Sequence, residues 1–116
     1  MAYTYKPIVG ARLTTAAVIY YLAGGVVGQP GVTSRCETVA FMNDTATDRT
    51  VTVHFVPNGG TASSSNMVIS ARTVKAGETL TFSECIGLTL APGGTLQCLA
   101  SANSAITING TFLDIT

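Results

Sequence analysis

The segment Thr-Val-Thr-Val-His-Phe at residues 50–55 alternates strictly between polar and apolar side chains. A period of two places Val51, Val53 and Phe55 on one face of a β-strand and the polar residues on the other. We therefore predict a strand here whose apolar face packs in a core. We place His54 on the polar face, in contact with solvent or with a partner.

Similar short runs recur along the chain, separated by turn residues, while helical periodicity is nearly absent. Residues 78–83 repeat the alternation with Leu80 and Phe82 inward, and further strands are predicted over 96–100 and from 106 to the end of the chain. Such spacing is typical of sandwiches and barrels. We predict an all-β fold, an antiparallel β-sandwich of Ig-like or jelly-roll-like topology with about seven or eight short strands.

Three stretches depart from simple alternation. Residues 37–43 are apolar on both faces, Met42 included, which predicts a central strand or one that lies against a partner. Residues 12–23 favour a strand through their β-branched and aromatic residues, although two alanines would suit a helix. In the last strand the apolar phase shifts between Phe112 and Leu113, and we expect a bulge at Gly110.

The length of 116 residues corresponds to one domain. We expect an extended N-terminal arm over residues 1–12 and a single β-sandwich domain over 13–116. We predict long loops in two segments: residues 24–33, which are rich in Gly, and residues 58–66, which are rich in Asn, Gly and Ser. Loops of this length in a small domain usually contact a partner or move.

Charged residues make up 10% of the chain and hydrophobic residues 47%, with six basic and six acidic side chains and a net charge of zero. Globular proteins carry about 25% charged residues, and low net charge favours association. The scattered basic residues disfavour nucleic-acid binding. No apolar run approaches the roughly 20 residues of a membrane span. The N-terminus lacks a secretory pattern, so we expect synthesis and retention in a cytoplasm.

The sequence offers few groups for chemistry. His54 is the one histidine, which excludes a histidine acid–base pair. Cys36, Cys85 and Cys98 are spaced too widely for a zinc knuckle, and we expect buried free thiols. Residues 43–48 lack the glycine and glutamate of a calcium loop and predict a turn. We predict a protein that is not an enzyme, with no catalytic, cofactor-binding or metal-binding residues and no cofactor.

The order of several short segments along the chain is similar to that in a known group of proteins. The segments are residues 13–16 (LTTA), 39–45 (VAFMNDT), 51–59 (VTVHFVPNG), 75–79 (KAGET), 87–94 (GLTLAPGG) and a last strand with Ile106, Ile108, Asn109 and Gly110. This order resembles the small β-sandwich virion proteins of tailed bacteriophages, which include capsid decoration (cement) proteins and neck or tail accessory proteins. A turn that often reads Pro-Gly-Asp in these proteins is Pro92-Gly93-Gly94 here. The resemblance therefore implies no role for an acidic residue at this turn.

The resemblance implies a non-enzymatic virion structural protein, in the first place a decoration protein that binds and stabilises the major capsid lattice. It implies the phage major capsid protein or other virion proteins as partners, a homo-oligomer such as a trimer, and a place in the virion after assembly in the host cytoplasm. The N-terminal arm and the Gly-rich loops are then expected to bind the capsid lattice. The candidate partner-binding residues are Tyr3, Tyr5, Pro7, Val26, Val27, Pro30, Met42 and Asn58.

Two other functions stay open. A neck, tail or fibre-associated protein would have about a dozen copies or fewer per particle, whereas a decoration protein symmetric with the capsid has hundreds. A carbohydrate-binding module would use flat aromatic rings. The chain has no Trp, four Tyr and four Phe, and the core needs most of these rings.

Overall fold

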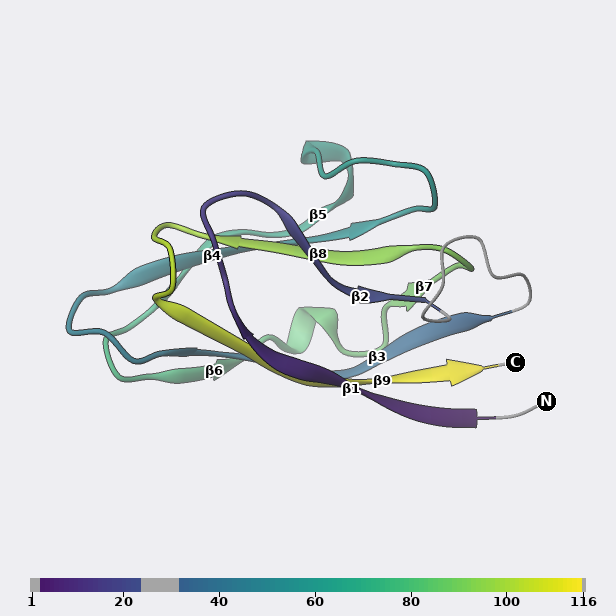
Figure 1. Cartoon of the computed structure of the whole chain (residues 1–116), viewed down its shortest axis with the longest axis horizontal. Helices are drawn as coiled ribbons and strands as arrows, with labels where there is room; N and C mark the ends of the chain where they lie inside the picture. The colour runs from purple at the N-terminus through teal and green to yellow at the C-terminus, as the bar shows by residue number, and fades with distance from the viewer. Residues whose placement is uncertain (1–2, 24–31, 116) are drawn as a thin grey trace.

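A computed structural model describes residues 3–23 and 32–115 of the chain. These residues form nine β-strands and two short 3-10 turns, with no α-helix among them. The strands make two antiparallel sheets that pack face to face (Figure 1). The predicted all-β sandwich is therefore confirmed.

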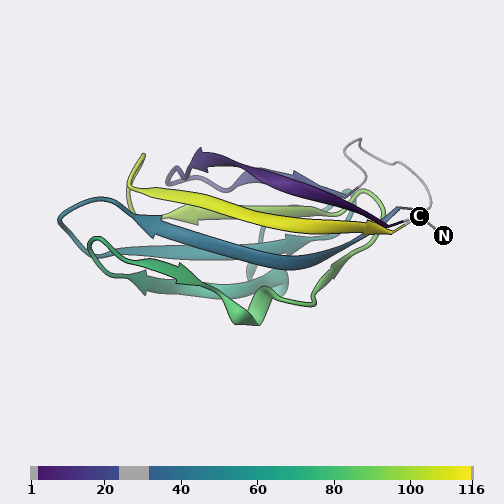
Figure 2. The same ribbon diagram turned by 90° about the horizontal axis from the view of Figure 1, so that it is seen from below.

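The first sheet, sheet A, has the strand order β1-β9-β3-β6, and β7 also pairs with β3. Figure 2 shows β1 in purple, β9 in yellow, β3 in blue and β6 in green side by side. Turn η2 separates β6 from β7. The bounds are β1 (Tyr3–Arg12), β9 (Ile106–Ile115), β3 (Thr33–Asn43), β6 (Thr79–Thr81), η2 (Ser83–Cys85) and β7 (Thr89–Leu90).

The second sheet, sheet B, has the strand order β2-β8-β4-β5. The first strand of the chain pairs with the last, and β2 pairs with the last strand but one, so the chain folds back on itself as a long, wrapped hairpin. This is the jelly-roll arrangement, and it decides between the two predicted topologies. The bounds are β2 (Val18–Leu22), β8 (Thr95–Ala100), β4 (Arg49–Val56) and β5 (Met67–Val74), with turn η1 (Ser64–Asn66) between β4 and β5.

The core lies between the two sheets. Val51 and Val53 of β4 are fully buried in it, as the alternation predicts. Phe41 of β3 and Phe82 after β6 have ring centroids 4.8 Å apart, and Phe112 of β9 is also fully buried. β3 lies between β9 and the β6–β7 edge, so the prediction of a central strand is confirmed.

The start of the chain differs from the prediction. The described part of the expected arm, Tyr3–Arg12, is extended but forms β1 and pairs with β9 along its length. The strand expected over 12–23 begins at Val18, because the chain must first cross from sheet A to sheet B. At this crossing Leu13 is fully buried, and its N–H donates to the Ile106 carbonyl at 2.8 Å.

The bulge expected in the last strand lies in its partners instead. The pairing with β9 shifts between Cys36 and Thr38 in β3 and between Ile8 and Ala11 in β1. β9 itself keeps its alternation, so Phe112 enters the core. Leu113 lies on the other side of sheet A, between Tyr5 and Arg35, and is 5% exposed. Gly110 is needed here because a Cβ would lie 2.3 Å from the Thr38 carbonyl oxygen.

The polar face of β4 is not solvent-exposed, which corrects the prediction for His54. Thr52, His54 and Val56 are 8%, 4% and 1% exposed. The loop over residues 57–66 folds back over this face, and Figure 1 shows its turn η1 beyond sheet B. The His54 Nδ1 lies 3.1 Å from the Ser63 carbonyl and 2.9 Å from the Asn66 Oδ1. Both oxygens accept, so Nδ1 carries the hydrogen.

Candidate assembly surface

The two sheets differ in what covers their outer faces. The loop 57–66 covers the β4 part of sheet B, whereas among the described residues no element crosses the outside of sheet A (Figure 2). Alternation along β3 and β9, with Phe41 and Ile108 inward, sets the residues that face outward. We call this surface the threonine face. It consists of Thr38, Ala40, Met42, Thr79, Thr81, Thr107, Asn109 and Thr111.

The register of the strands brings these side chains into rows. Met42 lies between Thr79 of β6 and Thr107 of β9, and Ala40 lies between Thr81 and Asn109. No residue of the threonine face is charged. A surface of methyl and hydroxyl groups can be buried against a partner without the cost of desolvating a charge. Interface centres are depleted of charge in the same way.

Ion pairs flank the threonine face at both ends. The Arg12 guanidinium bonds both oxygens of the Asp44 carboxylate, at 2.9 and 2.6 Å, and lowers the pKa of that carboxyl. Arg35 donates to Glu37 through two nitrogens, at 3.0 and 2.7 Å. The first pair joins β1 to the turn after β3 and the second lies within β3, and the surface between them is neutral.

Three predicted partner-binding residues of β1 lie beside the threonine face. Pro7 is in register with Thr111, and Tyr5 is in register with Leu113. Tyr3 and Tyr5 are 62% and 68% exposed. Together with Met42, which is 38% exposed, these residues occupy one side of sheet A. Val26, Val27 and Pro30 lie outside the described residues.

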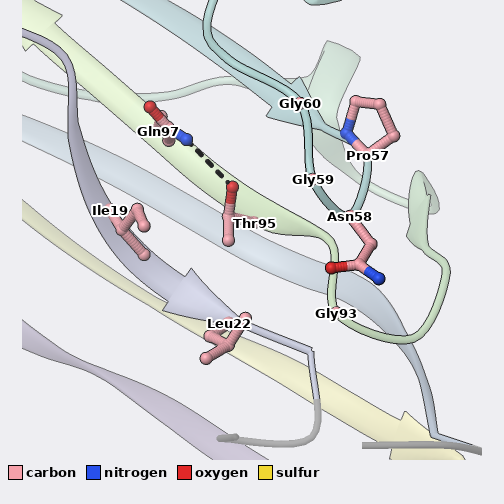
Figure 3. A pocket seen from close by; sticks show the side chains of 9 residues that line it. All are labelled: Ile19, Leu22, Pro57, Asn58, Gly59, Gly60, Gly93, Thr95 and Gln97. Carbon is pink, nitrogen blue, oxygen red and sulfur yellow. Dashed lines mark hydrogen bonds between the residues drawn. The ribbon is translucent and has the colours of Figure 1, made fainter. Parts of the chain in front are cut away.

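Asn58 lies elsewhere, at a shallow hollow of about 170 Å³ beside sheet B (Figure 3). Gly93 has φ +80°, and a Cβ there would lie 2.6 Å from the Asn58 Cγ, so the Asn58 side chain fills the space that glycine leaves. The lining has no charged or aromatic side chain: Ile19, Leu22, Pro57, Asn58, Gly59, Gly60, Gly93, Thr95 and Gln97. Small-molecule sites usually measure about 300–1,000 Å³, so this hollow is smaller than a typical ligand site.

The sequence reasoning missed a buried carboxylate. Asp114 is 6% exposed and accepts hydrogen bonds from the Ser34 hydroxyl at 2.5 Å and from the Tyr21 hydroxyl. Burial and this carboxylate raise the pKa of Tyr21, whose ring stacks on Phe112 at 4.1 Å. The signal was present, since Asp114 shares the inward parity of Phe112. Ser34 belongs to sheet A and Tyr21 to sheet B, so the Asp114 carboxylate joins the two sheets.

The thiols are unsuited to nucleophilic chemistry. Cys36, Cys85 and Cys98 are buried and unpaired, as predicted. Burial raises the pKa of Cys36 to about 12 and of Cys85 to about 11, so both stay protonated near neutral pH. Within residues 3–23 and 32–115, no three His, Cys, Asp or Glu side chains gather as metal ligands. The same residues contain no helix that is long and apolar enough to span a membrane.

The chain matches no known family model and no curated protein. It is similar in fold to a subunit of Bacillus endospore appendages, described as a family of disulfide-linked pili. That likeness has 19% identity and a TM-score of 0.54 and covers 98% of this chain and 88% of that one. A chain of infectious bursal disease virus, Gx strain, has 11% identity and a TM-score of 0.48, and this chain spans about a third of its length (33%). The first likeness supports the sandwich fold.

Proposed function

We propose that this chain is a non-enzymatic structural protein of a phage virion, a decoration protein that binds the major capsid lattice through the threonine face. The observation that carries the proposal is the difference between the sheets. The chain's own loop covers the β4 part of the outer face of sheet B, where His54 is buried, whereas among the described residues no element crosses the uncharged threonine face of sheet A.

The chemistry of the threonine face suits repeated weak contacts. Met42 and the threonine methyl groups supply apolar area, and the hydroxyls and the Asn109 amide supply hydrogen bonds. Such a face binds modestly at one site, and a symmetric lattice offers the same site many times. On this proposal the protein is assembled in the host cytoplasm and remains in the virion as a homo-oligomer.

The hollow at Asn58 gives no support to the carbohydrate-binding alternative. None of its lining residues is aromatic, and sugar rings stack on aromatic rings in most such sites. Asn58 remains a candidate for contact with a protein partner in this proposal.

The test compares two methionines of nearly equal exposure. Met42 on the threonine face is 38% exposed, and Met67 on β5 is 37% exposed. We expect saturable, stoichiometric binding of the wild-type chain to purified expanded capsids. Met42→Asp should weaken it at least about tenfold, because the new carboxylate must lose water in the contact. Met67→Asp is the matched control and should bind like the wild type.

Capsids that do not bind the wild-type chain would refute the proposed function. Equal binding by the two variants would refute the threonine face as the contact. Cosedimentation with capsids, quantified by the bound copies per particle, measures both outcomes.

A further inference from the structure

The sandwich has several sheet edges, and most of them are unsuited to pairing with another strand. β6 and β7 are three and two residues long. β2 has five residues and a register shift between Ile19 and Tyr21. β5 has two register shifts against β4, and Ala71 adopts φ +43°. Short strands and bulges are the usual ways in which an edge is protected from pairing.

The N-terminal half of β1 is longer and more regular than these edges, although it carries Lys6 and Pro7, two residue types that limit edge pairing. Residues Tyr3 to Ile8 pair with β9 over six consecutive positions without a register shift. Among the described residues, β9 is the strand that β1 pairs with, so its other side forms an edge of sheet A. A long, regular edge presents backbone donors and acceptors that another strand can use.

Backbone hydrogen bonds of the neighbouring strands show which residues of β1 turn toward this edge. The Val39 carbonyl accepts from the Phe82 N–H at 3.2 Å, so the backbone of Val39 points away from β9. Val39 lies opposite Gly110, whose backbone groups must therefore point to β1, where Ile8 lies opposite. Since successive residues alternate, Ile8 bonds to β9, and Tyr5 and Pro7 turn outward.

The bond from the Leu13 N–H to the Ile106 carbonyl agrees, because Ile106 and Gly110 share the same parity in β9. Pro7 has no N–H, and the outward position is the one that a proline can occupy in an edge strand without losing a ladder bond. The N–H and C=O of Tyr5 are thus groups that β1 offers to a new strand.

We propose that two copies of this chain pair antiparallel through β1, with the Tyr5 N–H and C=O bonding to β1 of the second copy, so that sheet A continues across a twofold axis. Three observations favour a second copy. The other edges of a neighbouring copy are short or bulged, so β1 is the matching strand. The chain has zero net charge, so two copies do not repel. Tyr5, at 68% exposure, gains cross-strand contacts.

This pairing goes beyond the proposed function and does not depend on a capsid. It uses the edge of sheet A and leaves the threonine face bare for a lattice. It also replaces the trimer implied by the phage resemblance with a twofold pair.

The first experiment separates the backbone of Tyr5 from its side chain. The purified full chain should sediment as a pair whose dissociation follows dilution. Tyr5→Pro removes the outward N–H but, like Pro7, leaves the hydrogen bonds between β1 and β9 in place. It should raise the dissociation constant of the pair at least about tenfold. Tyr5→Thr keeps the N–H and is the control, which should pair with a smaller loss. Both variants should unfold at temperatures close to the wild type.

A wild-type chain that stays monomeric or forms a trimer at about 100 µM, far above a micromolar dissociation constant, would overturn the inference. So would a Tyr5→Pro variant that pairs like the wild type.

The second experiment needs no variant. In amide hydrogen exchange resolved by NMR, Lys6 and Ile8 bond to β9 and should be protected at every concentration. The Tyr5 amide should be protected when the sample is concentrated and exchange rapidly when it is dilute. A Tyr5 amide that exchanges equally fast at both concentrations contradicts the pairing, even if Tyr5→Pro fails to fold.

Discussion

Gly110 shows how one residue sets the geometry of sheet A. Without a side chain, Gly110 lets the Thr38 carbonyl come close. A Cβ at this position would lie 2.3 Å from the Thr38 oxygen and 3.0 Å from both Ile8 Cδ1 and Val39 Cα. Two of these contacts are backbone atoms of β3 that cannot rotate away. The bulges in β1 and β3 flank this position and absorb the mismatch between the three strands.

We expect Gly110→Ala to lower the free energy of unfolding by about 3 kcal/mol, because overpacking forces the backbone of β3 to move. Urea denaturation followed by circular dichroism measures the change. Gly10→Ala is the control, since its nearest contact is the flexible Asn109 side chain at 3.1 Å. It should change stability by less than about 1 kcal/mol. Equal costs for the two variants would contradict this account.

Sequence reasoning located the glycine but not the strand that needs it. A glycine within an apolar run signals a bulge or a close approach. Which neighbour comes close depends on β3, about seventy residues earlier in the chain, and that pairing has no local signal. The same limit applies to His54. The sequence shows that residues 58–66 form a loop, but it does not show that this loop folds over His54.

At the scale of the elements, an ion pair joins sheet B to the sheet A edge. Arg72 of β5 pairs with Glu84 of η2, and its guanidinium carbon also lies 5.0 Å from the centre of the Phe82 ring. The pair crosses from one sheet to the other on the side away from β1. The neighbouring arginine lowers the pKa of Glu84 from 4.5 to about 2.

The pKa of Glu84 is lower in the folded chain than in the unfolded one. The ion pair therefore contributes its stability above about pH 4.5 and loses it as the pH falls toward about 2. We expect the free energy of unfolding to decline over this window. Glu84→Gln should flatten the decline while it keeps Arg72 over the Phe82 ring. A variant whose acid profile matches the wild type would show that the exposed pair adds nothing.

At the scale of the whole molecule, the core is one cluster that both sheets share, and all three thiols lie in it. Cys98 is fully buried between the sheets, and burial raises its pKa well above the usual value. Access to the thiols therefore requires the sheets to separate. The folded chain should protect all three cysteines from a water-soluble thiol reagent.

We expect no fast labelling of the native chain at pH 7 and labelling of three thiols in one step at the urea concentration where circular dichroism reports unfolding. Mass spectrometry of quenched samples counts the labels. One thiol that reacts well before the transition would show that an edge of the sandwich opens locally.

The sequence by itself determined the all-β class and the core face of β4, because these follow from alternation and composition within short segments. The tertiary structure decided that Tyr3–Arg12 is a strand of sheet A, that the loop 57–66 buries His54, and that the threonine face stays bare. The physical reason is that β-pairing joins residues far apart in the chain, such as Tyr5 and Leu113. Local propensity fixes that a strand forms, whereas the partner of each strand follows from how all the faces are buried together.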